Sequence, residues 1–363
     1  MERRQQETGE PPPRSVDYKA AGVDIDAGHE AVRRIRELAR GTFTPGVLSD
    51  IGSFGGLFKP DLSGLTEPVL VSSADGVGTK LKVAFRTGRH DTIGVDLVNH
   101  CVNDILVQGA TPLFFLDYLA SGRLSQGVTA DVVRGLASAC ADNRCALLGG
   151  ETAEMPGFYA DGEYDLAGFI VGLVDRPRLV EGSRIRPGDR LIGLPSTGLH
   201  TNGYSLARHI IFDTLGLTPE STPDGLDGSV GDVLLRPHRS YRGLGGPVLA
   251  ETDGAVGSGI IKGLAHITGG GLTDNLPRVL PEGTAAKIDR SGWQPPQVFR
   301  FLQQQGRLSD AESFRTFNMG IGMVVVCDAG AADALVARFQ EAGEGGAVAI
   351  GSVTAGDGTV NYV

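Results

Sequence analysis

The sequence is short of cysteine, of positive charge and of long apolar runs. Its 363 residues include four cysteines, none of them in a Cys-x-x-Cys pair, and a chain of this length needs no disulfides to hold a core. We therefore expect free, mostly buried thiols and a reducing, cytoplasmic location. Lys and Arg number 33 against 43 Asp and Glu, a net charge of −10, which would repel nucleic acid and anionic membranes. No apolar run approaches the ~18 residues of a membrane helix, so no membrane span is expected.

The composition is that of a globular protein with an excess of glycine. Hydrophobic residues make up 41% and charged residues 21% of the chain, which excludes a disordered or fibrous protein. Glycine accounts for 54 residues, about twice the usual ~7%, and predicts many tight turns and close backbone approaches. Residues 1–16 are charged and Pro-rich without the apolar stretch of a signal peptide, so we expect a disordered tail.

Strand and helix patterns alternate along the rest of the chain, which predicts an α/β or α+β protein. Helices are expected at 24–40, 79–87, 92–108, 129–143, 203–212, 296–305 and 331–342. Strands are expected at 69–73, 113–119, 145–148, 164–174, 190–194 and 322–327, with a terminal hairpin turning at 356–358. An aperiodic segment at 175–189 separates the halves, and we expect domains at 17–180 and 181–363.

The run from Ala74 to Lys80 is the strongest local indication of a binding site. A carboxylate, Asp75, ends a strand, and Gly76 and Gly78 form a turn at the start of a helix. Backbone N–H groups of such a turn can hold phosphate oxygens, while Lys80 supplies a cation and Asp75 holds Mg²⁺. A plain strand–turn–helix connection with Asp75 as N-cap remains the alternative.

The expected helix at 92–108 has one apolar side and one unusual polar side. The polar side carries only short carboxylates, amides and an imidazole: Asp96, Asn99, His100, Asn103 and Asp104. A solvated helix face is usually rich in Lys, Glu and Arg, whereas these groups bind hard cations and phosphates. We favour a functional face, with Asp104 as metal ligand or phosphate-positioning residue, over a merely solvated one.

A third acidic cluster, residues 149–157, follows an expected strand. Two glycines there place the carboxylate of Glu151 at the end of the sheet, where ligands gather in α/β folds. The alternative is an ordinary loop with Glu151 and Glu154 in solvent. Together the three acidic clusters favour a site more than each does alone.

The second half offers two polar runs. Residues 196–205 are dense in hydroxyl, amide and imidazole groups and open a helix that carries Arg208, an arrangement suited to a sugar phosphate or to a simple polar cap. Residues 268–271 precede another expected helix and form either an anion nest or a flexible cap. The histidines His200, His209, His238 and His266 lack the spacing of a zinc motif.

Taken in order, six runs resemble the phosphoribosylformylglycinamidine cyclo-ligase family, also called aminoimidazole ribonucleotide synthetases. They are residues 18–28, 75–80, 101–104, 149–157, 202–206 and 268–271, and the likeness extends from about Asp17 to the C-terminus. The chain departs from the family at Ala20, where Asp is common, and at Arg36, where some members carry Lys. Asn99 and His100 replace small or apolar residues.

The resemblance implies an α+β, two-domain ATP-binding fold of the aminoimidazole ribonucleotide synthetase superfamily. Its N-terminal sheet would pair across a homodimer and be followed by a C-terminal α/β domain. The implied reaction is ATP-dependent ring closure of formylglycinamidine ribonucleotide to aminoimidazole ribonucleotide, ADP and phosphate in purine biosynthesis. ATP and Mg²⁺ are the implied cofactors, and a need for K⁺ is left open.

The resemblance also implies roles for individual residues. The implied metal ligands are Asp75, Asp104 and Glu151. The implied nucleotide contacts are Asp75, Gly76, Val77, Gly78, Thr79, Lys80, Gly149, Gly150, Glu151 and Thr152. The implied substrate contacts are His200, Thr201, Asn202, Gly203, Arg208, Gly269 and Gly270. Asp104, Lys80 and His200 are the expected catalytic residues, with His200 the candidate general base.

Other functions stay in competition. Thiamine monophosphate kinase, selenophosphate synthetase and the carbamoyl-dehydrating hydrogenase maturation factor belong to the same superfamily. The last two use a reactive Cys or selenocysteine near the N-terminus or a Cys at the C-terminus, and this chain has no Cys before Cys101 and ends Asn361-Tyr362-Val363. The match at 149–157 weakens the kinase. A non-catalytic scaffold is the alternative from another class.

Overall fold

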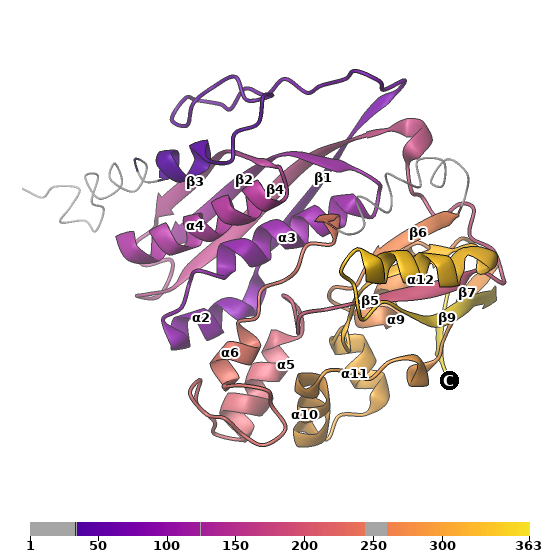
Figure 1. The fold of residues 1–363 in the computed structure, drawn as a ribbon. Coiled ribbons are helices and arrows are strands. Elements are labelled where there is room, and N and C mark those ends of the chain that lie inside the picture. Colours follow the sequence, from indigo (N-terminus) through magenta and orange to yellow (C-terminus); the bar gives the residue numbers. More distant parts are fainter. Residues whose placement is uncertain (1–32, 34, 124, 244–259) are drawn as a thin grey trace, which may run out of the picture.

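The computed structural model describes residues 33, 35–123, 125–243 and 260–363. Two sheets, each accompanied by helices, form the two halves of the molecule (Figure 1). The expected tail at 1–16 and the run at 18–28 lie outside the described residues. Of the expected helix at 24–40, residues 35–40 are described and helical.

The first half is a four-stranded sheet in the order β1-β4-β2-β3. Its strands are β1 (Pro68–Gly76), β2 (Thr111–Ser121), β3 (Ala146–Glu154) and β4 (Tyr164–Asp175). β4 pairs antiparallel with β1 and β2, and β2 pairs parallel with β3. Besides the helical residues 35–40, the described part of this half contains α2 (Leu81–Thr87), α3 (Ile93–Leu106) and α4 (Gln126–Asp142). α3 and α4 pack on one face of the sheet (Figure 1).

Glycines allow α3 and α4 to cross at very short range. A Cβ added to Gly94 of α3 would lie 2.2 Å from the Val132 carbonyl oxygen in α4, and one on Gly135 would lie 2.6 Å from the Asp91 carbonyl oxygen. No side chain fits at either position without moving backbone. The two helices therefore form one tightly packed layer behind the sheet.

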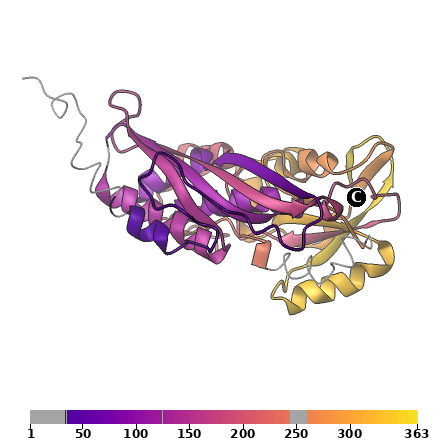
Figure 2. The ribbon, with the colours of Figure 1, turned by 90° about the horizontal axis from the view of Figure 1, so that it is seen from above.

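The opposite face of this sheet carries no helix of the described chain. Leu70 on β1 and Phe169 on β4 point outward there and are 66% and 46% exposed. The helix-facing positions alternate with them, and Leu166 and Ile170 are fully buried. Seen from above, the long strands of this sheet extend away from the second half (Figure 2). Residues 46–58 lie over part of β2 and β3, where Phe58 contacts Phe114. The part of the face over β1 and β4 is therefore open and partly apolar.

The second half is a six-stranded sheet in the order β10-β7-β9-β5-β8-β6. Its strands are β5 (Arg190–Pro195), β6 (Ile261–His266), β7 (Thr284–Ile288), β8 (Ile321–Cys327), β9 (Val348–Ala355) and β10 (Val360–Tyr362). All pairs are antiparallel except β10 with β7. α12 (Ala332–Glu341) packs on β5 and β9. The other helices are α5 (Tyr204–Arg208), α6 (Val230–Leu234), α9 (Gly271–Asn275), α10 (Gln297–Gly306) and α11 (Asp310–Thr316).

Three predicted features need correction. The terminal hairpin is wrong, because β10 pairs with β7 rather than with its neighbour β9. The strand expected at 145–148 continues to Glu154, so the glycine cluster lies within β3 and not in a loop. The helix expected from Thr79 begins with a 3-10 turn, Gly78–Lys80, before α2. The helix expected after residues 268–271 is present as α9, whereas β6, β7, α6 and α11 were not individually foreseen.

The polar side of α3 is covered by the second half instead of by solvent. The Asn99 side chain donates to the His238 carbonyl at 2.8 Å, and the Asn103 side chain donates to the Arg239 carbonyl at 2.8 Å. The Tyr241 N–H in turn donates to Asn103 Oδ1 at 2.9 Å. Residues 236–241 thus lie along α3 and fix the two halves together. Of the polar side predicted to be functional, Asp104 at its end borders a cavity.

Two further observations bear on the sequence analysis. All four cysteines are buried with free thiols. Among the described residues, no helix has both the length and the apolar character needed to cross a membrane. The expected domain boundary at 180/181 falls in the connection between β4 and β5 and stays a prediction.

Candidate active site

Two carboxylates meet where β1 and α3 come together. Asp75 lies near the end of β1 and Asp104 in the last turn of α3, and Ser73 Oγ is 3.1 Å from a carboxylate oxygen of each. Their side chains are 25% and 29% exposed. The sequence predicted both residues as metal ligands, and the fold brings these two side by side.

The two carboxyls have pKa values displaced in opposite directions. Burial and the nearby charge of Asp104 raise the pKa of Asp75 to about 7. Burial would also raise the pKa of Asp104, but the hydrogen bond and charge of His266 outweigh it and hold that pKa below its usual range. Two adjacent carboxylates repel each other when both are ionised, and a cation bound between them relieves that repulsion. The pair therefore fits the oxygen chemistry of Mg²⁺.

A cavity of about 680 Å³ opens beside this pair. Ser73 and Asp104 line it from the first half, and His266, Asn275 and Arg278 line it from the second. The sequence analysis missed His266 and Arg278 as site residues, although both flank the predicted 268–271 run. A guanidinium and carboxylates at one cavity suit a phosphate bound together with a metal ion.

The glycine turn after β1 is open to solvent and adjoins the second half. Gly76, Gly78 and Thr79 are exposed, and Gly78 has φ +62°, a conformation that favours glycine. Thr79 Oγ1 lies 3.0 Å from Ser205 Oγ of α5. Val77 differs from the expectation, since its side chain is fully buried and only its backbone could reach a ligand.

Lys80 does not lie where a phosphate-binding cation is expected. Its side chain is fully buried, and Nζ donates to Asp96 Oδ1 at 2.8 Å, to the Arg236 carbonyl at 2.8 Å and to the His200 carbonyl at 3.2 Å. Burial lowers the pKa of Lys80, and the charge of Asp96 opposes that shift. All three ammonium donors are used inside the protein. We correct its role to a structural one that joins the two halves.

His200 and Thr201 are likewise buried, contrary to the expected substrate contacts. His200 is fully enclosed, and its Nε2 accepts from the Thr197 N–H at 3.2 Å. Burial lowers its pKa well below the usual value, so the ring is neutral. Thr201 Oγ1 lies 2.8 Å from His100 Nδ1. Neither residue lines the cavity beside Asp104.

The remaining predicted substrate residues are better placed. Asn202, Gly203 and Arg208 are partly exposed. Asn202 lies against the 268–271 turn, because a Cβ added to Gly269 would be 3.3 Å from Asn202 Oδ1. Gly270 has φ +96° and caps α9. The fold thus brings the two polar runs of the second half together.

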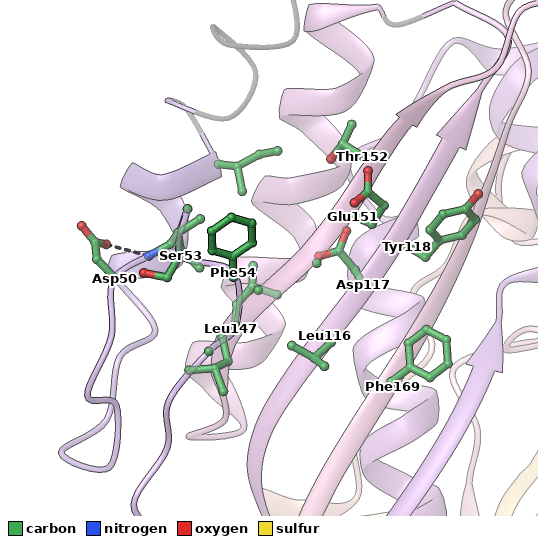
Figure 3. Close-up of a pocket in the computed structure, with 18 residues that line it drawn as sticks. Asp50, Ser53, Phe54, Leu116, Asp117, Tyr118, Leu147, Glu151, Thr152 and Phe169 are labelled. Atoms are coloured by element: carbon green, nitrogen blue, oxygen red, sulfur yellow. Dashed lines mark hydrogen bonds between the residues drawn. The ribbon is translucent and has the colours of Figure 1, made fainter.

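Glu151 lies in a different cavity from Asp75 and Asp104. This cavity, of about 600 Å³, is lined by the stretch 149–152, by Asp117 and by residues 50–56 (Figure 3). Neighbouring strands pair Asp75 with Gly168, Gly168 with Asp117, and Asp117 with Gly150. At ~4.8 Å between neighbouring strands, Asp75 and Gly150 are about 14 Å apart. Within one chain, Glu151 therefore does not share an ion with the other two carboxylates.

Asp117 is an acidic residue of this second cavity that sequence reasoning missed. Burial raises its pKa to about 7, and a Cβ on Gly150 would lie 2.3 Å from its Oδ1. The close fit explains why a glycine stands beside it in β3. Nothing in the flanking residues Leu116 and Tyr118 indicated a polar contact at this position.

Comparisons with known proteins identify the family. Models for the N-terminal and C-terminal domains of AIR synthase related proteins match residues 62–174 and 186–363. A phosphoribosylformylglycinamidine cyclo-ligase of Sorangium cellulosum is 54% identical over 93% of this chain and 97% of its own length. One from Desulfitobacterium hafniense is 54% identical, covering 90% and 94%.

Solved structures give the same fold at lower identity. Thiamine-monophosphate kinase from Stenotrophomonas maltophilia aligns with TM-score 0.64 at 20% identity, covering 92% of this chain and 95% of its own. The hydrogenase maturation protein HypE in complex with ATP aligns with TM-score 0.62 at 18% identity, covering 92% and 90%. The α+β superfamily fold and the predicted ligase class are confirmed. The chain belongs to the phosphoribosylformylglycinamidine cyclo-ligase family, ligases that carry out a ring closure in purine biosynthesis.

Proposed function

We propose that the cavity beside Asp75 and Asp104 binds the triphosphate of ATP with Mg²⁺ and is the centre of ring closure. The observation that carries this proposal is the meeting of two carboxylates, from β1 and α3, beside a cavity that Arg278 also lines. The turn at 76–79 follows directly after Asp75 in the chain. Mg²⁺ held by Asp75 and Asp104 would neutralise charge on the phosphates. Backbone N–H groups of Gly76, Gly78 and Thr79 would cradle phosphate oxygens.

The chemistry we propose is activation of an amide oxygen. The γ-phosphoryl group of ATP passes to the formyl oxygen of formylglycinamidine ribonucleotide, which gives an O-phosphoryl imidate and ADP. The amidine nitrogen then attacks the activated carbon, phosphate leaves, and the five-membered ring closes with loss of a proton. The protein mainly has to position the groups and stabilise charge.

We propose that the second half holds the phosphoribosyl end of the substrate. Asn202, Gly203 and Arg208 together with the turn at Gly269 and Gly270 supply amide and guanidinium donors at the edge of that half. His200 and Thr201 support this region from inside. We therefore replace their expected direct contacts by a positioning role.

The uncovered face of the first sheet supports a homodimer. Leu70 and Phe169 remain exposed on it, and the Glu151 cavity opens on the same sheet. Pairing of two such faces would bury these side chains and would bring residues 149–152 of one chain towards a nucleotide of the other. Sedimentation of wild type and Leu70→Asp tests this: we expect a dimer that dissociates in the variant, and a monomeric wild type would contradict it.

The test of the function is ADP release with and without formylglycinamidine ribonucleotide. Turnover that depends on this substrate supports cyclo-ligase activity, and assays with and without K⁺ test whether the enzyme requires this ion. We also propose a cytoplasmic location. Nucleotide binding without substrate-stimulated turnover would instead indicate a non-catalytic subunit.

A further inference from the structure

Four imidazoles and two carboxylates gather where the halves meet. His100 comes from α3, His238 from the segment along α3, His266 from β6, and His200 from the loop after β5. Among the described residues two sets have ligand atoms within 4.8 Å of one another: His200, His238 and His266, and His100, Asp104 and His266. His266 belongs to both sets, so ring orientation must decide between them.

The first set cannot converge on one ion as it stands. The rings of His200 and His238 are stacked, with centroids 4.0 Å apart and an interplanar angle of 18°. A metal ion lies in the plane of each imidazole that binds it, and nearly parallel planes at this separation do not share such a point. His100 and His266, by contrast, are at 89° with centroids 5.3 Å apart. The second set therefore has the better geometry.

Hydrogen bonds decide which nitrogen of His266 faces the carboxylates. Because the Tyr241 N–H donates to Asn103 Oδ1, the Asn103 amide nitrogen must be the atom 3.2 Å from His238 Nε2. His238 Nε2 is then an acceptor, and His266 Nε2, 3.0 Å away, donates to it. His266 Nδ1 is thus the ring nitrogen directed at the carboxylates, 2.7 Å from Asp104 Oδ1. This nitrogen, Asp104 and His100 offer ligand atoms that all lie within 4.8 Å of one another.

His100 is held in a matching way. Its Nδ1 lies 2.8 Å from Thr201 Oγ1, which leaves Nε2 facing Asp75 Oδ1 at 3.5 Å. Metal-binding imidazoles commonly use their second nitrogen in such an orienting hydrogen bond. Asp75 and Asp104, the proposed Mg²⁺ ligands, are thus each flanked by an imidazole nitrogen. The mutually close donor set is two imidazole nitrogens and the Asp104 carboxylate, with the Asp75 carboxylate beside His100.

That donor set differs from what Mg²⁺ prefers. Mg²⁺ takes oxygen ligands in octahedral geometry, whereas imidazole nitrogens favour Mn²⁺, Co²⁺, Ni²⁺ and Zn²⁺, in the order of the Irving–Williams series. The two carboxylates supply the charge that such a dication needs, and the cavity beside Asp104 gives an entry path.

We propose that His100 and His266 extend the Asp75–Asp104 pair into a site that binds a first-row transition-metal dication more tightly than Mg²⁺. The inference rests on the metal role given to these two carboxylates in the proposed function. Its consequence is that this cyclo-ligase takes Mn²⁺, Co²⁺ or Zn²⁺ where an all-oxygen site would take Mg²⁺. His100 and His266 are the specificity-determining residues, because Asp75 and Asp104 alone would form an oxygen site.

The experiment is metal binding to the full-length protein after removal of metals with EDTA. Co²⁺ is titrated by its visible absorption, and Mg²⁺ is tested by its competition with Co²⁺. We expect one Co²⁺ per chain, with Mg²⁺ competing at least ~10-fold more weakly. His100→Ala should weaken Co²⁺ at least ~10-fold and change Mg²⁺ affinity little. His209→Ala, at an exposed histidine beside Asp213, is the matched control and should bind like wild type.

A second measurement covers the case in which His100→Ala does not fold. Wild-type protein loaded with one Cu²⁺ should show coupling to two imidazole nitrogens in its electron spin echo spectrum. No coupling, equal affinity for Co²⁺ and Mg²⁺, or unchanged Co²⁺ binding in a folded His100→Ala would each overturn the proposal. These readouts need no substrate, so a protein that closes the ring with Mg²⁺ but fails them refutes only the metal preference.

Discussion

Replacing Lys80 by Met tests whether this lysine is structural or binds phosphate. The ammonium is fully buried and donates to Asp96 and to two carbonyls of the second half. The variant keeps most of the side-chain volume but leaves Asp96 as an uncompensated buried carboxylate. Removal of one partner from such a pair costs about 3 to 5 kcal/mol, equivalent to a melting temperature about 6 to 10 °C lower at ~2 °C per kcal/mol for a large domain.

Differential scanning calorimetry and nucleotide-binding calorimetry together separate the two roles. We expect Lys80→Met to lose stability, and the double variant Lys80→Met/Asp96→Asn to recover part of it, because the amide keeps the acceptor for the His238 N–H. Lys82→Met is the control: Lys82 forms a half-exposed pair with Glu163 and should cost at most ~1 kcal/mol. A Lys80→Met protein with wild-type stability and weakened ATP affinity would refute the structural role.

Three further predictions concern packing, pH and the open sheet face. Gly94→Ala should destabilise by about 1 to 3 kcal/mol through overpacking against α4, whereas Gly127→Ala, where an added Cβ meets nothing within 4 Å, should stabilise α4 by up to ~1 kcal/mol; equal urea midpoints would contradict this. Burial raises the pKa of Asp117 in the folded protein to about 7. The contribution of the protonated carboxyl to the free energy of unfolding is therefore fully present below pH ~4 and is lost as the pH rises to about 7. Asp117→Asn should therefore become more stable than wild type between pH 5 and 8, by up to ~4 kcal/mol in free energy of unfolding. A difference in urea unfolding that does not depend on pH would argue against a buried carboxyl. Phe169→Glu should abolish dimerisation, measured by light scattering, with little change in melting temperature. An unchanged dimer would show that the interface does not lie on this face of the sheet.

The sequence predicted elements well where periodicity and local turns determine them. α3, α4 and β4 lie within a few residues of their expected bounds, because each carries a clear apolar side. The pairing of β10 with β7 could not be predicted, since local sequence at 356–358 favours a turn but does not specify a partner strand. The extension of β3 was hidden by Gly149 and Gly150, of which Gly150 is required by the packing of Asp117.

The sequence identified two carboxylates of the candidate site but not the geometry around them. Asp75 and Asp104 were identified because their local runs are distinctive, and they do converge. Lys80 was misassigned because a motif cannot show that the second half covers its ammonium. His238 and His266 carry no local pattern at all, and their contact depends on the packing of a separate segment against α3.

The measurement that tests the central claim most directly is steady-state ADP release by Asp104→Asn in the presence of formylglycinamidine ribonucleotide. Asp104 touches Ser73 and His266 and borders the cavity, and the variant retains its shape while losing the charge that would hold the metal and phosphates. We predict turnover lowered at least ~100-fold with a melting temperature close to that of wild type. A folded Asp104→Asn enzyme with near-normal turnover would contradict the placement of ring closure at this carboxylate pair.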